Sequence, residues 1–178
     1  MSRAMIGIEN SDESIDAIYC CYDGQVEIVG WYLYSRFNTE ERLRELISLG
    51  DIQSIGARIG NKIDFNKYCE NKNYYNANKN QVVAYHRDMM WAMKEHHYRN
   101  RDDYAHSVKL EVEYIYLYSD GTWYIRNAGD KTRFCMLDKR LKRTDVKYSY
   151  DDYVTDVDGN FTQEEKMDFK EAYDCLFS

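Results

Sequence analysis

Residues 109–118, with the sequence KLEVEYIYLY, have the cleanest alternation in the chain and decide its fold class. In an extended strand, successive side chains point to opposite faces of a sheet. The alternation therefore predicts two sets of side chains on opposite faces: Leu110, Val112, Tyr114, Tyr116 and Tyr118 against Glu111, Glu113, Ile115 and Leu117. The turn residues at 119–121 (SDG) follow, so a strand over residues 122–126 would complete a β-hairpin.

A second hairpin is predicted at the start of the chain. β-rich runs at residues 4–9 and 15–22 flank a short polar turn. Two helices would follow it. Residues 26–37 form an apolar stretch long enough for a buried helix, and residues 40–49 carry leucines and isoleucine at helical spacing after a polar N-cap.

Three later segments are less regular. Residues 61–80 are rich in Asn and Lys and predict an exposed excursion that is either mobile or functional, because it is too long for an ordinary connection. The spacing of Met89 and Met93 predicts a helix over residues 89–99. A short strand and a short helix are expected within residues 133–143.

Together these segments predict an α+β fold: an antiparallel sheet built from two β-hairpins and packed against three to five helices. Residues 1–147 would form the α+β domain. Residues 148–178 would add an acidic connector and a C-terminal amphipathic helix to the same domain. Thr162 and Glu165 have the spacing of a capping box at the start of that helix.

Composition and charge narrow the functional classes. The net charge is −7, divided into −5 over residues 1–60, +5 over 61–147 and −7 over 148–178. Acidic ends around a basic middle argue against general nucleic-acid binding, and leave a local basic site or an acidic face for a basic partner. No apolar stretch approaches the roughly 18 residues that cross a bilayer. Five scattered cysteines and no secretory signal indicate reduced thiols in a cytosol.

No motif predicts catalysis, a metal or a cofactor. The Asp/Gly-rich residues 156–160 resemble part of a calcium loop, but Val154 occupies its first ligand position. His86-Arg87-Asp88 resembles the kinase catalytic triplet, yet Met93 stands where the asparagine is required. The sequence therefore argues against an enzyme. An acid–base pair of His86 and Asp88 remains the weakest of three functional alternatives.

The order of several short motifs resembles a group of small uncharacterised tailed-phage accessory proteins. The motifs cover about the first two-thirds of the chain and include Ile18-Tyr19-Cys20, Tyr22-Asp23-Gly24, Gly50-Asp51-Ile52, Ala84-Tyr85-His86-Arg87-Asp88 and Tyr116-Leu117-Tyr118. Cys21 and Gln25 depart from the pattern, where the group would have a histidine or other polar residue and an aromatic. The resemblance implies an origin in a phage and a location in the cytoplasm of the infected bacterial host, without an activity.

Two further hypotheses follow from these observations. In the first, the chain binds and inhibits a host protein, such as a defence or nucleic-acid-handling factor, through an acidic face: Asp151, Asp152, Asp156, Asp158, Glu164 and Glu165. In the alternative, it is a ligand-binding module that sequesters a nucleotide signal with aromatic and basic side chains: Tyr85, Arg87, Tyr124, Arg140 and Arg143. The oligomeric state stays open.

Overall fold

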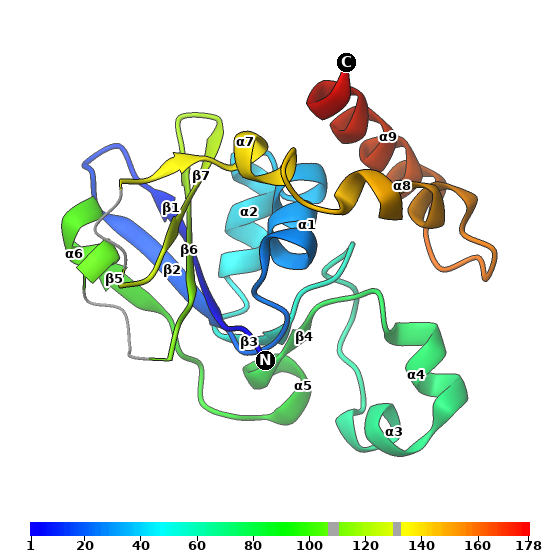
Figure 1. The fold of residues 1–178 in the computed structure, drawn as a ribbon. Helices are drawn as coiled ribbons and strands as arrows, with labels where there is room; N and C mark the ends of the chain where they lie inside the picture. The colour runs from blue at the N-terminus through cyan, green and yellow to red at the C-terminus, as the bar shows by residue number, and fades with distance from the viewer. Residues whose placement is uncertain (107–110, 130–132) are drawn as a thin grey trace.

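The computed structural model describes residues 1–106, 111–129 and 133–178, which form an α+β fold around one sheet (Figure 1). Its strands are β1 (Ala4–Glu9), β2 (Ile15–Cys20), β3 (Ile52–Ser54), β4 (Val83–Ala84), β5 (His96–Tyr98), β6 (Tyr114–Ser119), β7 (Thr122–Asn127) and β8 (Cys135–Met136). They are ordered β4-β3-β2-β1-β6-β7-β8, and β5 pairs with β2 beside this path.

Both predicted hairpins are present, but the expectation of a purely antiparallel sheet is wrong. β1 and β2 pair antiparallel, as do β6 and β7, whereas β1 and β6 run parallel from Ala4↔Tyr114 to Ile8↔Tyr118. β2 and β3 are also parallel. The chain between the hairpins returns to the same end of the sheet before β6 begins, and such a crossover makes parallel neighbours.

Helices are more numerous than the expected three to five. The described residues contain one π-helical turn, η1, and nine α-helices, most of them short: η1 (Val26–Gly30), α1 (Trp31–Arg36), α2 (Glu40–Ile47), α3 (Phe65–Glu70), α4 (Lys72–Asn78), α5 (Tyr85–Met89), α6 (Arg101–His106), α7 (Leu137–Leu141), α8 (Val146–Thr155) and α9 (Gln163–Phe177). None of them is long and apolar enough to cross a membrane.

Two sequence expectations about these helices fail. Residues 89–99 are not a helix, because α5 ends at Met89, Met90 adopts a left-handed conformation and the chain continues to the edge strand β5. The acidic stretch expected as a connector contains α8, and its C-cap Asp156 is also left-handed. The capping box of Thr162 and Glu165 is confirmed.

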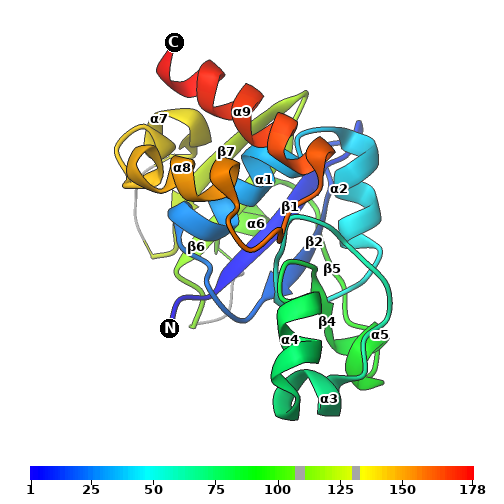
Figure 2. The same ribbon diagram turned by 90° about the vertical axis from the view of Figure 1, so that its right-hand side faces the viewer.

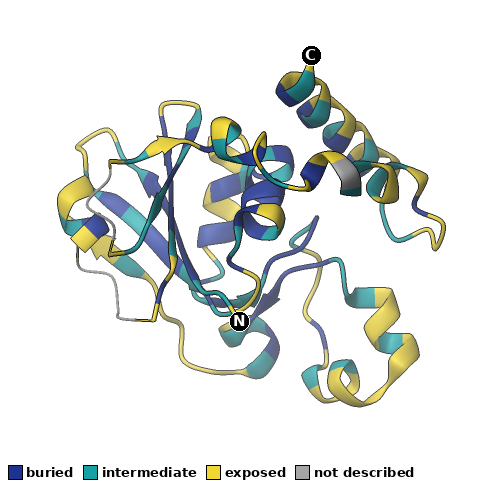
Figure 3. Cartoon of the chain, viewed as in Figure 1, coloured by how far each residue is buried: buried dark blue, intermediate teal, exposed yellow. Residues whose placement is uncertain are grey.

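The sheet separates two hydrophobic cores. On one face, Tyr116 and Tyr118 join the larger core with η1, α1, α2 and α7, while Ile115 and Leu117 face the smaller core under α6. The alternation is therefore confirmed for residues 114–118. It is wrong for residues 111–113, which precede β6, and Val112 is buried in the smaller core with Ile115 instead of sharing the face of Tyr116. Lys109 and Leu110 lie outside the described residues. Figure 3 shows that α1 and the centre of the sheet are buried, while α3 and α4 are largely exposed.

The C-terminal helices extend the larger core. Trp31 of α1 is fully buried, and its ring lies 5.9 Å from the rings of both Phe169 in α9 and Tyr153 in α8. In Figure 2, α8 and α9 lie over α1 on the helical side of the sheet. Residues 148–178 are thus packed on the same core as the sheet.

The smaller core depends on a close approach between Gly7 of β1 and Tyr104 of α6. Tyr104 is fully buried, and its hydroxyl donates a 2.7 Å hydrogen bond to the carbonyl of Tyr116. A Cβ atom at residue 7 would lie 2.9 Å from Cζ of Tyr104 and 3.0 Å from Cγ2 of Ile15. Only glycine leaves room for the phenol ring at this point.

We expect Gly7→Ala to lower the free energy of unfolding by about 1–3 kcal/mol, the usual cost of overfilling a packed core. Urea denaturation measures the loss. In a Tyr104→Leu background the added methyl group has room, so the same substitution should cost much less. Equal losses in both backgrounds would contradict this account of the packing.

Candidate functional site

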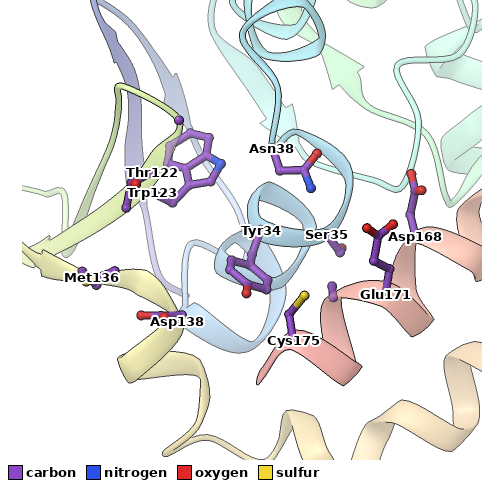
Figure 4. A pocket seen from close by; sticks show the side chains of 12 residues that line it. Tyr34, Ser35, Asn38, Thr122, Trp123, Met136, Asp138, Asp168, Glu171 and Cys175 are labelled. Atoms are coloured by element: carbon purple, nitrogen blue, oxygen red, sulfur yellow. The ribbon is translucent and has the colours of Figure 1, made fainter. Parts of the chain in front are cut away.

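A pocket of about 280 Å³ opens between α1, the β6–β7 hairpin, the β8–α7 segment and α9 (Figure 4). Its lining comes from four separate parts of the chain: Tyr34, Ser35, Asn38, Gly121, Thr122, Trp123, Met136, Asp138, Asp168, Glu171, Ala172 and Cys175. Ligand pockets for drug-sized molecules hold about 300–1,000 Å³. This pocket is therefore sized for one side chain rather than for a large cofactor.

The wall formed by the hairpin is rigid and aromatic. Trp123 is 4% exposed, and its indole Nε1 donates a 3.0 Å hydrogen bond to the carbonyl of Phe37, at the end of α1. The ring of Tyr118 packs edge-on against it at 5.3 Å, and the Tyr118 hydroxyl donates to the carbonyl of Asn38. These contacts hold the Trp123 ring in place beside the pocket.

Three arginines position the wall formed by α9. Arg58 makes two hydrogen bonds to the buried carboxylate of Glu165, at 2.9 and 2.6 Å. Arg36 and Arg42 both bind Asp168, the latter at 2.9 Å. Because these arginines belong to α1, α2 and the loop after β3, they fix the start of α9 against the sheet domain.

The lining is acidic, and the described residues that form it include no Lys, Arg or His. The charge of Asp168 is compensated by ion pairs with Arg36 and Arg42. Among the described residues, neither Asp138 nor Glu171 has a cationic partner. In Figure 4, Asp138 and Glu171 lie on different sides of Tyr34. Burial, followed by the negative charges that Cys175 and Asp138 can carry, raises the pKa of the Tyr34 hydroxyl.

This arrangement has the chemistry of a cation receptor. Asp138 and Glu171 have no cationic partner among the described residues and can accept hydrogen bonds from an ammonium or guanidinium group. The Tyr34 hydroxyl and the amide oxygen of Asn38 can accept such bonds as well. Trp123, Met136 and Ala172 offer apolar surface to the aliphatic stem of such a side chain.

The six residues predicted as an acidic contact face do not all reach the surface. Asp151, Asp152 and Asp158 are exposed, and so is Glu164, which pairs with Arg42 at 2.8 Å. Asp156 is buried and accepts hydrogen bonds from the amides of Asn160 and Phe161. Glu165 is also buried and forms an ion pair with Arg58. These two carboxylates stabilise the fold and cannot contact a partner.

The five residues predicted to bind a nucleotide are not brought together. Arg87 is used internally, in bonds to Asp88 and to the carbonyls of Ile59 and Val82. Tyr124 lies on the sheet face of the smaller core. Arg140 donates a hydrogen bond to Asn127 of β7. Asn127 lies three residues after Tyr124 in this strand, so the two side chains point to opposite faces of the sheet. Arg143 is exposed.

In the acid–base alternative, the carboxylate of Asp88 is already engaged in hydrogen bonds inside the protein. Asp88 is buried and accepts hydrogen bonds from the amides of Ile63 and Ala84 as well as from Arg87. His86 is exposed and contacts the carbonyl of Trp91 instead. Across the described part of the chain, no three His, Cys, Asp or Glu side chains are grouped so that they could hold a metal ion.

Comparisons with protein-family models, with curated proteins and with solved structures found no match to this chain. The pocket residues themselves were not predicted from the sequence. One signal was available in α9, where Glu164, Asp168, Glu171 and Cys175 recur at helical spacing and form one stripe. Asp138 and Trp123 join that stripe only through the tertiary fold.

The pair of Arg58 and Glu165 makes the docking of α9 sensitive to acid. Burial alone would raise the pKa of Glu165, but hydrogen bonds from Arg58 and from the Thr162 amide outweigh it and lower the pKa below the ordinary 4.5. A lowered folded-state pKa contributes stability that is complete above the unfolded-state value and disappears as the pH falls through the folded-state value.

We therefore expect Glu165→Gln to destabilise the protein at pH 7 by about 1.5–3 kcal/mol, the worth of hydrogen bonds to a charged group. It should also weaken the dependence of stability on pH below about 4.5, the unfolded-state value. Urea denaturation between pH 3 and pH 7 measures both effects. Glu164→Gln, at an exposed neighbouring carboxylate, is the matched control and should change little; an equal effect would contradict the assignment.

Proposed function

We propose that this chain is a phage accessory protein that binds a basic surface of a host bacterial protein and inhibits it. The observation that carries the proposal is the acidic pocket, whose carboxylates Asp138 and Glu171 have no cationic partner among the described residues. Internal ion pairs satisfy the other carboxylate of the lining. The pocket is thus complementary to an Arg or Lys side chain from outside.

The charge of the surrounding segment supports the same partner. Residues 148–178 carry nine acidic and two basic residues, so their net charge equals the −7 of the whole chain. After the buried and arginine-bound carboxylates are set aside, Asp151, Asp152 and Asp158 remain exposed in or near α8. Clustered charge of one sign attracts an oppositely charged partner and speeds the encounter.

The class of partner follows from this chemistry. Proteins that handle nucleic acid present Lys and Arg to phosphate groups, and a defence factor that recognises nucleic acid does the same. An acidic surface that inserts carboxylates among those residues would compete with the natural substrate. The resemblance to phage accessory proteins supports a host protein as the target.

The experiment compares two double variants of the tagged chain in pull-downs from bacterial lysate, followed by affinity measurement with the captured protein. Asp138→Asn with Glu171→Gln should lower the affinity at least tenfold. Close charge pairs across protein interfaces are coupled by about 1.5 kcal/mol or more, and about 1.4 kcal/mol corresponds to a factor of ten.

The matched control is Glu41→Gln with Glu45→Gln, which removes two exposed carboxylates from α2 without touching the pocket. It should keep full affinity. Binding by wild type should also weaken as the salt concentration rises, and the pocket variant should respond less. A captured protein that binds both variants and wild type equally would rule out the pocket as the contact.

A further inference from the structure

The loop after α5 presents a rigid, exposed tryptophan. Met90 adopts a left-handed conformation, with φ 59°, and turns the chain back on α5. The Trp91 amide donates a 3.1 Å hydrogen bond to the carbonyl of Tyr85, and the two rings stack at 4.9 Å with planes 17° apart. His86 contacts the carbonyl of Trp91 at 2.7 Å. Trp91 is therefore held in place although it faces solvent.

Large apolar side chains around this loop are unusually exposed. Met90 is 80% exposed and Trp91 59%, and Met93 follows at 44%. The other tryptophans, Trp31 and Trp123, are buried. Aromatic residues and methionine are enriched at the cores of protein–protein interfaces, and a rigid tryptophan is a frequent hot spot. Figure 3 shows this segment between α5 and β5 as largely exposed.

An apolar groove of about 760 Å³ lies between this loop and the exposed segment that contains α3 and α4. Its lining is mainly apolar and aromatic: Ile63, Phe65, Tyr74, Met89, Met90 and Trp91. The lining also contains two carboxylates, of which Asp88 is buried and paired with Arg87, whereas Asp64 is exposed. Asp88 accepts hydrogen bonds from the amides of Ile63 and Ala84, and Asp64 caps α3 through the Lys67 amide.

One side of the groove is formed by residues 61–80, a segment with a net positive charge. Lys62 lines it, is exposed and has no acidic partner among the described residues. The segment of residues 61–80 carries four lysines and two acidic residues, and Lys67 and Lys72 are exposed as well. A complementary occupant would place apolar side chains against Met90 and Trp91 and a carboxylate near Lys62.

We propose that the apolar groove docks a short segment of a partner protein with two or more large apolar side chains flanked by Asp or Glu. Trp91 and Met90 receive the apolar side chains, and Lys62 pairs with a flanking carboxylate. This site is independent of the acidic pocket, which involves other elements and has the opposite charge preference. It gives the chain a second binding surface beyond the proposed function.

The test uses a display library of random 12-residue peptides, selected on the immobilised full chain. Enriched peptides should combine large apolar residues with an excess of Asp and Glu. Synthetic versions should then shift the fluorescence of the folded chain, because Trp91 is its solvent-exposed indole. Trp91→Ala should lower the affinity at least tenfold, and Lys62→Gln about threefold.

A second variant guards against an effect on folding. Met90→Asn removes the apolar side chain but tolerates the left-handed backbone, so the loop should keep its shape while the affinity falls severalfold. Asp138→Asn with Glu171→Gln should bind the peptides as wild type does, which separates this groove from the acidic pocket. Enrichment that persists in Trp91→Ala, enrichment of basic or uncharged peptides, or no enrichment would overturn the proposal.

Discussion

The ion pairs of Arg36, Arg42 and Arg58 with α9 are the contacts on which the acidic pocket depends. They connect α1, α2 and the loop after β3 to Asp168 and Glu165 at the start of the terminal helix. Stacking of Phe169 on Trp31 completes the junction. Together these contacts fix the first turns of α9, and they place Glu171 across the pocket from the hairpin.

The carboxylates of the pocket and of the C-terminal segment thus include two groups with different roles. Asp156, Glu165 and Asp168 are bound by backbone amides or by arginines, and their charge is compensated inside the protein. Asp138 and Glu171 face the pocket without a cationic partner among the described residues, and Asp138 accepts one hydrogen bond, from the Lys139 amide. Removing a carboxylate of the first group should damage the fold, whereas removing one of the second should leave the fold intact and change only binding. This division explains why a net count of acidic residues overstates the surface available to a partner.

Local features of the fold could be predicted from the sequence. The alternation over residues 114–118 gave the two faces of β6, and the spacing of Thr162 and Glu165 gave the start of α9. The parallel pairing of β1 with β6 could not be predicted, because alternation is the same in parallel and antiparallel strands. The helix expected over residues 89–99 was wrong, since the left-handed backbone of Met90 ends α5 and the spacing of Met89 and Met93 does not register such a break.

The candidate site was less accessible to prediction than the fold. The acidic bias of the C-terminus was visible, but the arginines that neutralise part of it lie more than 100 positions earlier in the chain. Only the tertiary structure shows which carboxylates they reach. The same holds for the nucleotide hypothesis, where Tyr124 and Arg140 are close in sequence but belong to opposite faces of the sheet.

The most direct measurement is site-specific photo-cross-linking from Met136, a half-exposed residue of the pocket lining, in bacterial cells that express the chain. A benzophenone amino acid at this position reacts with whatever lies against the pocket, and mass spectrometry identifies the attached peptide. The account predicts one host protein, attached through a peptide that contains Arg or Lys within a basic surface. Cross-links only to acidic or uncharged peptides, or none above those from an exposed control position such as Glu41, would contradict it.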